Sequence, residues 1–202
     1  MTRPQYPGAR VNPRGYLAKV ASIIWLDLET TGLDPRGGFL LEIAVQSADA
    51  ADPLKCGELA HTAVKTARAQ AWDAADEYVW RMHTENGLWD DCERSPVTLA
   101  EVDDMLAEAF KLTEAERVSG QRHMLAGNSI GSFDLQWVRH HLPKFACTLS
   151  HRVFDVSTLI AMAEMLGWEY ERQEPAHRAA DDIEVSQNTL RSIFAFLTQA
   201  TQ

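Results

Sequence analysis

Residues 22–29 read Ser22-Ile23-Ile24-Trp25-Leu26-Asp27-Leu28-Glu29, and Thr30-Thr31-Gly32 follow them. A continuous apolar run of this length, rich in β-branched residues, predicts a buried strand. Successive side chains of a strand alternate between its faces, so Asp27 and Glu29 point the same way. Two carboxylates this close repel each other unless a cation lies between them, and their hard oxygens suit Mg²⁺ or Mn²⁺. The alternative is a solvated pair of acids on an edge strand.

The rest of the chain gives shorter strand and helix signals. Residues 40–45 predict a second strand, and residues 34–38 before it have the chemistry of a hairpin loop. Thr98 and Glu101 have the capping-box spacing of a helix start. Further signals predict a short strand at residues 124–128 and helices at about 133–141, 157–166 and 179–197. Residues 50–75 predict no clear element. Early strands followed by helices indicate the α/β or α+β class with a mixed sheet.

The composition is that of one globular domain. The chain has 202 residues, with 19 Lys plus Arg against 29 Asp plus Glu and a formal net charge of −10. This acidic balance argues against a protein that grips long duplexes by bulk charge, and no apolar run is long enough to predict a membrane span. The separated cysteines Cys56, Cys92 and Cys147 predict free thiols in a reducing compartment, which we take to be the cytoplasm. Residues 1–20 predict a flexible extension.

Other acids and a histidine could join the first pair of carboxylates. Asp134 stands near a predicted helix start, where a lone Asp is most often a cap or a surface charge. His177 precedes Asp181 and Asp182, and helical spacing alone does not decide which aspartate would share a site with it. A histidine just before a helix suits a general base, whereas the alternative is a helix N-terminus decorated with acids.

Together these pieces resemble the DEDDh family of 3′-to-5′ exonucleases: Asp-x-Glu on a strand, a middle Asp that opens a helix, and His-x4-Asp near the end. The resemblance is closest to the oligoribonucleases within that family, and it spans residues 23 to about 195. Its blocks are residues 25–35, 83–88, 127–131, 155–159 and 177–183. It implies an α/β, ribonuclease H-like fold, in which a mixed β-sheet flanked by α-helices forms an exonuclease domain over residues 21–202.

The resemblance also implies a reaction and its catalytic residues. Two divalent cations, Mg²⁺ or Mn²⁺, would be held by four carboxylates, and His177 would deprotonate the attacking water. The metal ligands would be Asp27, Glu29, Asp134 and Asp182, since the family spacing favours Asp182 over Asp181. Very short RNA oligomers, especially dinucleotides, would be cut from the 3′ end to nucleoside 5′-monophosphates.

The substrate contacts follow from the same resemblance. Leu33 would wedge against the bases, and Tyr78 would stack on them where the family typically has Trp. Arg152, Ser157 and Thr158 would cap the 5′ phosphate from a second protomer, which implies a homodimer. The remaining predicted contacts are Thr30, His83, Asn128 and Ser129. No membrane partner is expected.

Some positions depart from the family pattern. His151 replaces the tyrosine expected beside Arg152, and Phe133 gives a Ser-Phe-Asp block closer to the proofreading and tRNA-trimming branches. Residues 46–76 do not follow the family. Two alternatives therefore stay open: an exonuclease acting on single-stranded DNA or longer RNA, and a catalytically silent nucleic-acid-binding domain.

Overall fold

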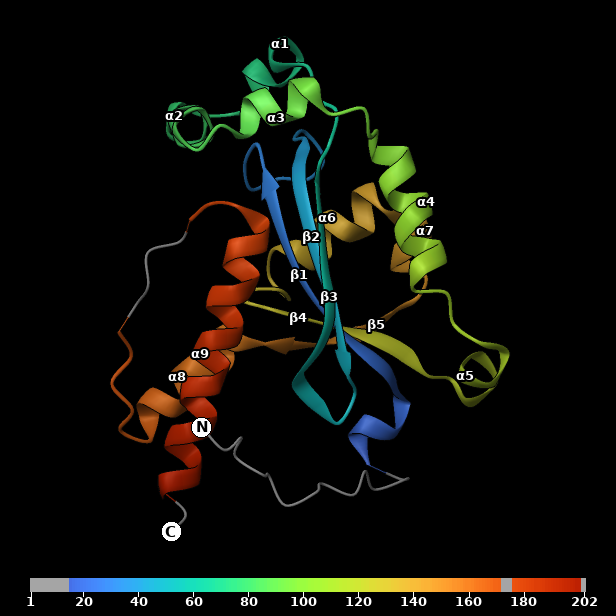
Figure 1. Cartoon of the computed structure of the whole chain (residues 1–202), viewed down its shortest axis with the longest axis vertical. Coiled ribbons are helices and arrows are strands. Elements are labelled where there is room, and N and C mark those ends of the chain that lie inside the picture. Colours follow the sequence, from blue (N-terminus) through green and yellow to red (C-terminus); the bar gives the residue numbers. More distant parts are fainter. Residues whose placement is uncertain (1–14, 172–175, 201–202) are drawn as a thin grey trace.

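The structure, a computed structural model, describes residues 15–171 and 176–200. A five-stranded mixed sheet with the strand order β3-β2-β1-β4-β5 forms its centre, and helices flank it (Figure 1). The strands are β1 (Val20–Thr30), β2 (Leu40–Asp49), β3 (Asp52–Ala63), β4 (Arg122–Gly127) and β5 (Leu149–Asp155). The first three are antiparallel neighbours, whereas β4 and β5 run parallel to β1. The prediction of an α/β fold with a mixed sheet between helices is confirmed.

Strand β1 lies in the middle of the sheet and is buried on both faces, as its sequence predicts. Ile24, Leu26 and Leu28 point into one core, whereas Ile23 and Trp25 point into the other. The first core is covered by α4 (Leu99–Ala109), α6 (Asp134–His141) and α7 (Pro143–Ala146), and the second by α8 (Val156–Met165) and α9 (Ala179–Ala200). Asp27 and Glu29 follow Ile23 and Trp25 in the alternation along the strand, so their carboxylates face the side of the sheet that α9 covers.

A smaller helical layer stands over the ends of β1 and β2 (Figure 1). It consists of α1 (Arg68–Ala71), η2 (Trp72–Ala74), α2 (Glu77–Glu85) and α3 (Leu88–Arg94). Leu41 of β2 packs there against Leu88, Trp89 and Cys92, all fully buried. This third core fixes α2 and α3 beside the acid-bearing end of β1.

Several predicted elements are confirmed, with adjusted bounds. Thr98 and Glu101 form the capping box of α4, in which Thr98 N donates to Glu101 Oε2 at 2.8 Å. Helix α6 ends at His141, and Pro143 then occupies the first turn of α7, where its missing N–H costs nothing. Helix α8 ends before Gly167, whose φ of +93° suits glycine.

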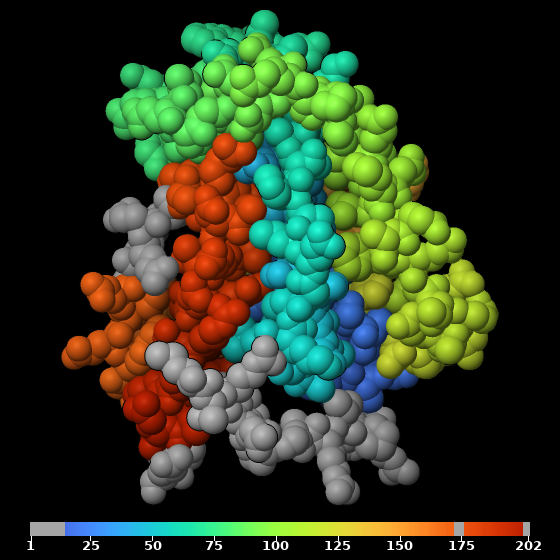
Figure 2. Space-filling view, viewed as in Figure 1, coloured from blue at the N-terminus to red at the C-terminus, as the bar shows by residue number. Residues whose placement is uncertain are grey.

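The segment without a predicted element contains strand β3. Residues 52–63 form the exposed edge of the sheet, and Figure 2 shows β3 at the surface between α9 and α4. Its burial pattern has no alternation because neither face is fully covered, so no hydrophobic period marks it in the sequence. The other strand and α-helices that the sequence did not predict are strand β5 and the short helices α1, α2, α3, α5 (Glu114–Ser119) and α7.

The start of the chain is described from residue 15 onward. Residues 16–19 form a single turn, η1 (Tyr16–Lys19), and Leu17 packs against the core on the α9 side. Residues 1–14 of the predicted extension lie outside the described residues. All three cysteines carry free thiols. No helix in the described ranges has the length and apolarity that a membrane crossing requires.

Candidate active site

Strand β1 carries the first two acids of the site at its C-terminal end. Glu29 is 7% exposed and lies opposite Glu42 in the β1–β2 register, while Asp27 is partly buried one pleat earlier. The strand is hydrogen-bonded to β2 on one side and to β4 on the other. Both carboxylates therefore lie on the central strand of the sheet, at positions that pair with Ala44 and Glu42 of β2.

Asp134, the first residue of α6, supplies the third acid. It is 3% exposed, and its carboxylate accepts a hydrogen bond from the Leu28 backbone, which brings it to β1. The turn from β4 into α6 needs Gly127, since a Cβ there would lie 2.7 Å from Leu26 O. Close approach of β4 to β1 thus places the start of α6 beside the acids of β1.

The loop before α9 carries the histidine and the last acid. His177 has a φ of +53°, a left-handed conformation that costs a non-glycine residue about 1–3 kcal/mol. Asp182 accepts a hydrogen bond from Ala176 N at 3.0 Å, which closes the loop onto the helix. One ligand atom each from Glu29, His177 and Asp182 lie within 4.8 Å of one another, whereas Asp181 is exposed and outside this group.

Burial and mutual repulsion raise the pKa values of these acids. Burial, with the charges of Asp182, Glu42 and Asp134, raises the pKa of Glu29 to about 8. Burial likewise raises the pKa of Asp134 to about 8 and that of Asp27 well above its usual range, and it raises the pKa of Asp182.

A cluster of carboxylates in this state is costly when ionised and becomes favourable once a cation neutralises it. The hard oxygen donors of these carboxylates suit a divalent cation such as Mg²⁺ or Mn²⁺. The residues present therefore fit the metal that the sequence predicts.

His83 lies beneath the site and is fully buried. Its Nε2 is 3.4 Å from Thr30 O and 3.7 Å from Glu29 Oε2. Burial lowers the pKa of His83 to about 4, so the ring is neutral at neutral pH. In this position His83 contacts Glu29, and its predicted contact with substrate stays a prediction.

A pocket of about 360 Å³ opens beside His177. Its lining residues are Tyr78, Arg81, Met82, Glu85, Asn86, Ala176 and His177. Tyr78 is 56% exposed, so its ring is free to stack on a base. Of these lining residues, only Tyr78 and His177 were predicted from the sequence. Residues 78, 81, 82 and 85 form one face of α2, which the helical period would have shown had that helix been predicted.

Leu33 lies on the loop that follows β1, and its side chain is 87% exposed. The base of this loop is closed by two contacts: Phe39 N donates to Thr31 Oγ1 at 2.9 Å, and His141 Nε2 lies 2.9 Å from Pro35 O. Gly38 packs so tightly on Trp137 that a Cβ would lie 2.5 Å from Trp137 Cη2. A short, anchored loop therefore presents Leu33 to solvent.

The other predicted substrate contacts lie outside the pocket lining. Thr30 is buried and donates to Gly32 O at 2.8 Å, and Asn128 is exposed beside Ser129, whose φ is +55°. Ser157 Oγ donates to Asp155 Oδ1 at 2.5 Å, and Thr158 is exposed at the start of α8.

Arg152 projects from β5 into solvent. Its guanidinium carbon lies 4.3 Å from the centre of the Tyr16 ring. Among the described residues, no carboxylate pairs with this guanidinium. A cation held on an aromatic face and not neutralised by an acid can bind an anion.

The chain is similar to known proteins over most of its length. The family model described as "Exonuclease" matches residues 24–190, most of the chain. An oligoribonuclease of Halorhodospira halophila is 33% identical over 84% of this chain and 91% of its own length. The oligoribonuclease of Klebsiella pneumoniae is 34% identical over 82% of this chain and 89% of its own length.

Solved structures show the same fold in more distant proteins. An E. coli exonuclease I in complex with single-stranded DNA, in a zinc-bound form, has a TM-score of 0.61 and 13% identity. The alignment covers 89% of this chain but 43% of that one, so the chain spans less than half of exonuclease I. The exonuclease I of Methylocaldum szegediense has a TM-score of 0.55 and 19% identity, over 83% of this chain and 36% of that chain.

Proposed function

The chain belongs to the oligoribonuclease family of exonucleases, and from that premise we propose that it is a 3′-to-5′ exoribonuclease acting on very short RNA, especially dinucleotides. One observation carries the proposal: Glu29 of β1, Asp182 of α9 and His177 offer ligand atoms within 4.8 Å of one another, and the charges of Asp134, Glu29 and Asp182 act on Asp27. The elements that bring them together are far apart in sequence. A catalytically silent domain would have no need of this costly cluster.

The chain's own residues divide the work of hydrolysis. Asp27, Glu29, Asp134 and Asp182 would hold two divalent cations, Mg²⁺ or Mn²⁺. When bound, these ions supply the positive charge that activates a water and stabilises the phosphate as its ester bond breaks. A ring nitrogen of His177 takes the proton of the attacking water. The oxygen of water joins phosphorus, the bond to the 3′ oxygen breaks, and that oxygen gains a proton. The product is a nucleoside 5′-monophosphate.

Base stacking would select the substrate. Tyr78 offers an exposed ring at the pocket beside His177, and Leu33 offers an exposed apolar side chain on its anchored loop. Thr30, His83, Asn128 and Ser129 are the further predicted contacts. Any nucleobase can stack on an aromatic face, so stacking gives no sequence preference. Substrates would therefore be selected by the length of the RNA and not by its sequence.

A homodimer would complete the length selection. Arg152, Ser157 and Thr158 would cap the 5′ phosphate of a substrate held in the partner's groove. Two observations support this role: no carboxylate in the described ranges pairs with Arg152, and α8 exposes Met162, Met165 and, just after it, Leu166. An exposed apolar helix face of this kind suits contact with a second copy of the chain. The cytoplasmic location also stays a prediction.

The second candidate is an exonuclease that acts on single-stranded DNA or on longer RNA. The Ser-Phe-Asp block before α6 favours it, since that block is closer to the proofreading and tRNA-trimming branches of the DEDDh family; Phe133 packs against the core there. An open groove without a cap would accept chains of any length.

A time course separates the two candidates. The substrates are 5′-phosphorylated RNAs of two, three, five and seven nucleotides and the matching DNAs, each with Mn²⁺ and with EDTA. Strong preference for the RNA dinucleotide, lost on Arg152→Ala, supports the capped exoribonuclease. Equal or faster cleavage of the longer chains contradicts it and favours the second candidate. Activity that survives EDTA would contradict the metal assignment in either case.

A further inference from the structure

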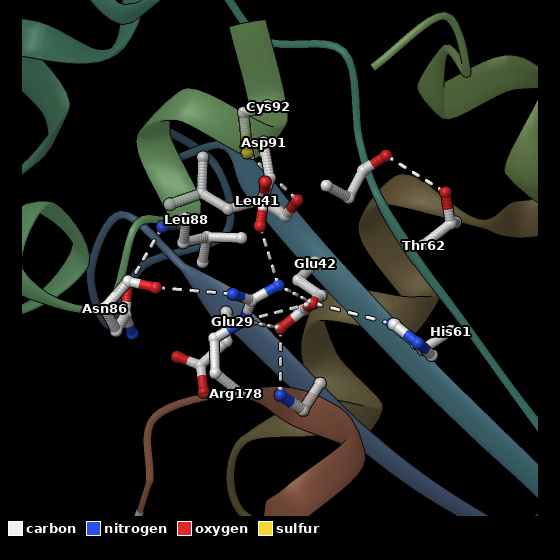
Figure 3. A network of polar contacts seen from close by, with 12 residues as sticks. Glu29, Leu41, Glu42, His61, Thr62, Asn86, Leu88, Asp91, Cys92 and Arg178 are labelled. Atoms are coloured by element: carbon white, nitrogen blue, oxygen red, sulfur yellow. Dashed lines mark hydrogen bonds and ion pairs between the residues drawn. The ribbon is translucent and has the colours of Figure 1, made fainter. Parts of the chain in front are cut away.

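A network of polar contacts surrounds Arg178, the residue directly after His177 (Figure 3). Its guanidinium binds the Glu42 carboxylate of β2 with two nitrogens: Nη2 donates to Oε1 at 2.8 Å, and Nε donates to Oε2 at 3.1 Å. Nη2 also donates to Asp91 Oδ2 of α3 at 2.9 Å, and Nη1 to Asn86 O at 3.3 Å. The Glu42 side chain is 1% exposed and that of Arg178 is 27% exposed, so the carboxylate of this planar, two-pronged ion pair is shielded from water.

The same network holds the backbone that directly follows the His177 side chain. Asn86 Nδ2 donates to His177 O at 2.6 Å, and Ala179 N donates to Glu42 Oε2 at 3.0 Å. The carbonyl of residue 177 is thereby tied to the turn between α2 and α3, and the first amide of α9 is tied to β2. Two independent anchors fix a loop that has no strand pairing of its own.

The loop needs these anchors because its conformation is unfavourable by itself. His177 has a positive φ, which a non-glycine residue keeps only where its surroundings enforce it. Glu42 also lies directly opposite Glu29 across the strand pair. Its carboxylate is already engaged by Arg178 and Ala179 N, so it is not free to join Glu29 and Asp182 as a further ligand.

We propose that Glu42, Arg178 and Asn86 act as positioning residues that hold His177 at the acids of β1 and α9. The proposal rests on the proposed function, in which His177 is the general base. A base displaced by about 1 Å can lose roughly a hundredfold in rate, although substrate binding is unchanged. Loss of the anchors should therefore lower kcat and leave KM nearly the same.

The first test compares variants inside and outside the network. Arg178→Gln removes the two-pronged ion pair, and Asn86→Ala removes the anchor on His177 O without changing any charge. The matched control is Arg94→Gln, because Arg94 binds the same Asp91 from the solvent side, Nη2 to Oδ1 at 3.0 Å, and is 73% exposed. On a 5′-phosphorylated RNA dinucleotide with Mn²⁺, we expect kcat to fall about 10–100-fold for the first two, with KM within about threefold. Arg94→Gln should match the wild type.

The second test uses the His177→Ala background. If Arg178 acts through His177, the double variant His177→Ala/Arg178→Gln should be no slower than His177→Ala alone. An additive loss would overturn the proposal, as would a change confined to KM. Asn86→Ala carries no charge change, so it keeps the proposal falsifiable if Arg178→Gln fails to fold.

A readout without turnover separates this proposal from the proposed function. The ¹³C-labelled Cε1–Hε1 signal of the His177 ring, assigned by its loss in His177→Ala, should shift or broaden in Arg178→Gln and Asn86→Ala but not in Arg94→Gln. An unchanged signal in both network variants would overturn the positioning role even if the enzyme is active. If wild-type protein cleaves no substrate, or if His177→Ala keeps full activity, the proposed function fails, and this signal still reports on the anchors.

Discussion

Strand β1 and the loop before α9 carry the two halves of the candidate active site, and they position their side chains by opposite means. Asp27 and Glu29 lie on the central strand of the sheet and pair there with Ala44 and Glu42 of β2, so the strand ladder fixes their backbone. His177 lies on a loop whose carbonyl and following residues are held by the side chains of Asn86 and Glu42. The strand keeps its backbone conformation although its acids repel each other, whereas the conformation of the loop depends on a few side-chain contacts.

The largest expected effect comes from the acids themselves. Asp134→Asn removes one carboxylate with almost no change of shape, and we expect activity to fall roughly a thousandfold or more. The metal-free protein should become more stable, because burial and repulsion already disfavour the charged Asp134. Steady-state kinetics with Mn²⁺ check the loss of activity, and thermal melts in EDTA check the gain in stability. The matched control is Asp181→Asn on the exposed side of α9, which should change neither; full activity in Asp134→Asn would refute the assignment.

The second effect isolates the loop. His177→Ala should lower kcat about 10²–10⁴-fold, the usual contribution of a general base. The affinity for Mn²⁺, measured by calorimetry, should change far less than it does in Glu29→Gln, because the acids supply most of the metal-binding charge. The opposite result is that His177→Ala loses Mn²⁺ affinity, while the protein that still binds Mn²⁺ keeps the wild-type kcat. That result would show that the histidine is a metal ligand and not a base.

The third effect concerns α2, where His83 contacts Glu29 of β1 and Asn86, directly after the helix, contacts His177. Tyr78→Ala removes the exposed ring beside the pocket, and KM for an RNA dinucleotide should rise about tenfold, since one base–aromatic stack contributes about 1–3 kcal/mol. Tyr78→Trp should restore the wild-type KM. Equal KM values for the wild type, Tyr78→Ala and Tyr78→Trp would show that no nucleobase stacks on residue 78.

The smallest effect is a pH dependence of stability. In the folded chain the pKa of Glu29 and that of Asp134 are both about 8, against ordinary values near 4, so the folded state binds protons more tightly than the unfolded state. Their stabilising contribution is complete below about pH 4 and is lost as the pH rises through 8. Thermal melts in EDTA should therefore show Tm falling by some degrees between pH 5 and pH 8. Mn²⁺ should reverse the fall, and a Tm that rises with pH in EDTA would contradict the pKa shifts.

The sequence predicted the parts of the molecule that depend on local patterns. The apolar run of β1, the capping box at Thr98 and the alternation that puts Asp27 beside Glu29 are all local, and each is confirmed. Strand β3 escaped prediction because an exposed edge strand needs no hydrophobic alternation. The pairing of Arg178 with Glu42 joins residues 136 positions apart, so no spacing rule reveals it. Helical spacing alone did not separate Asp182 from Asp181; the family resemblance favoured Asp182, and the structure brings Asp182 close to Glu29 and His177.

The anchored loop that carries Leu33 has a consequence for protein engineering. Its tip is open to solvent at Leu33, Asp34 and Arg36, while its base is locked by Gly38 against Trp137. Randomised libraries at the three tip positions should therefore yield mostly folded proteins. Any library that includes position 38 should lose most of its members to misfolding. Substrate range can be diversified at the rim of this site without disturbing the sheet that bears its acids.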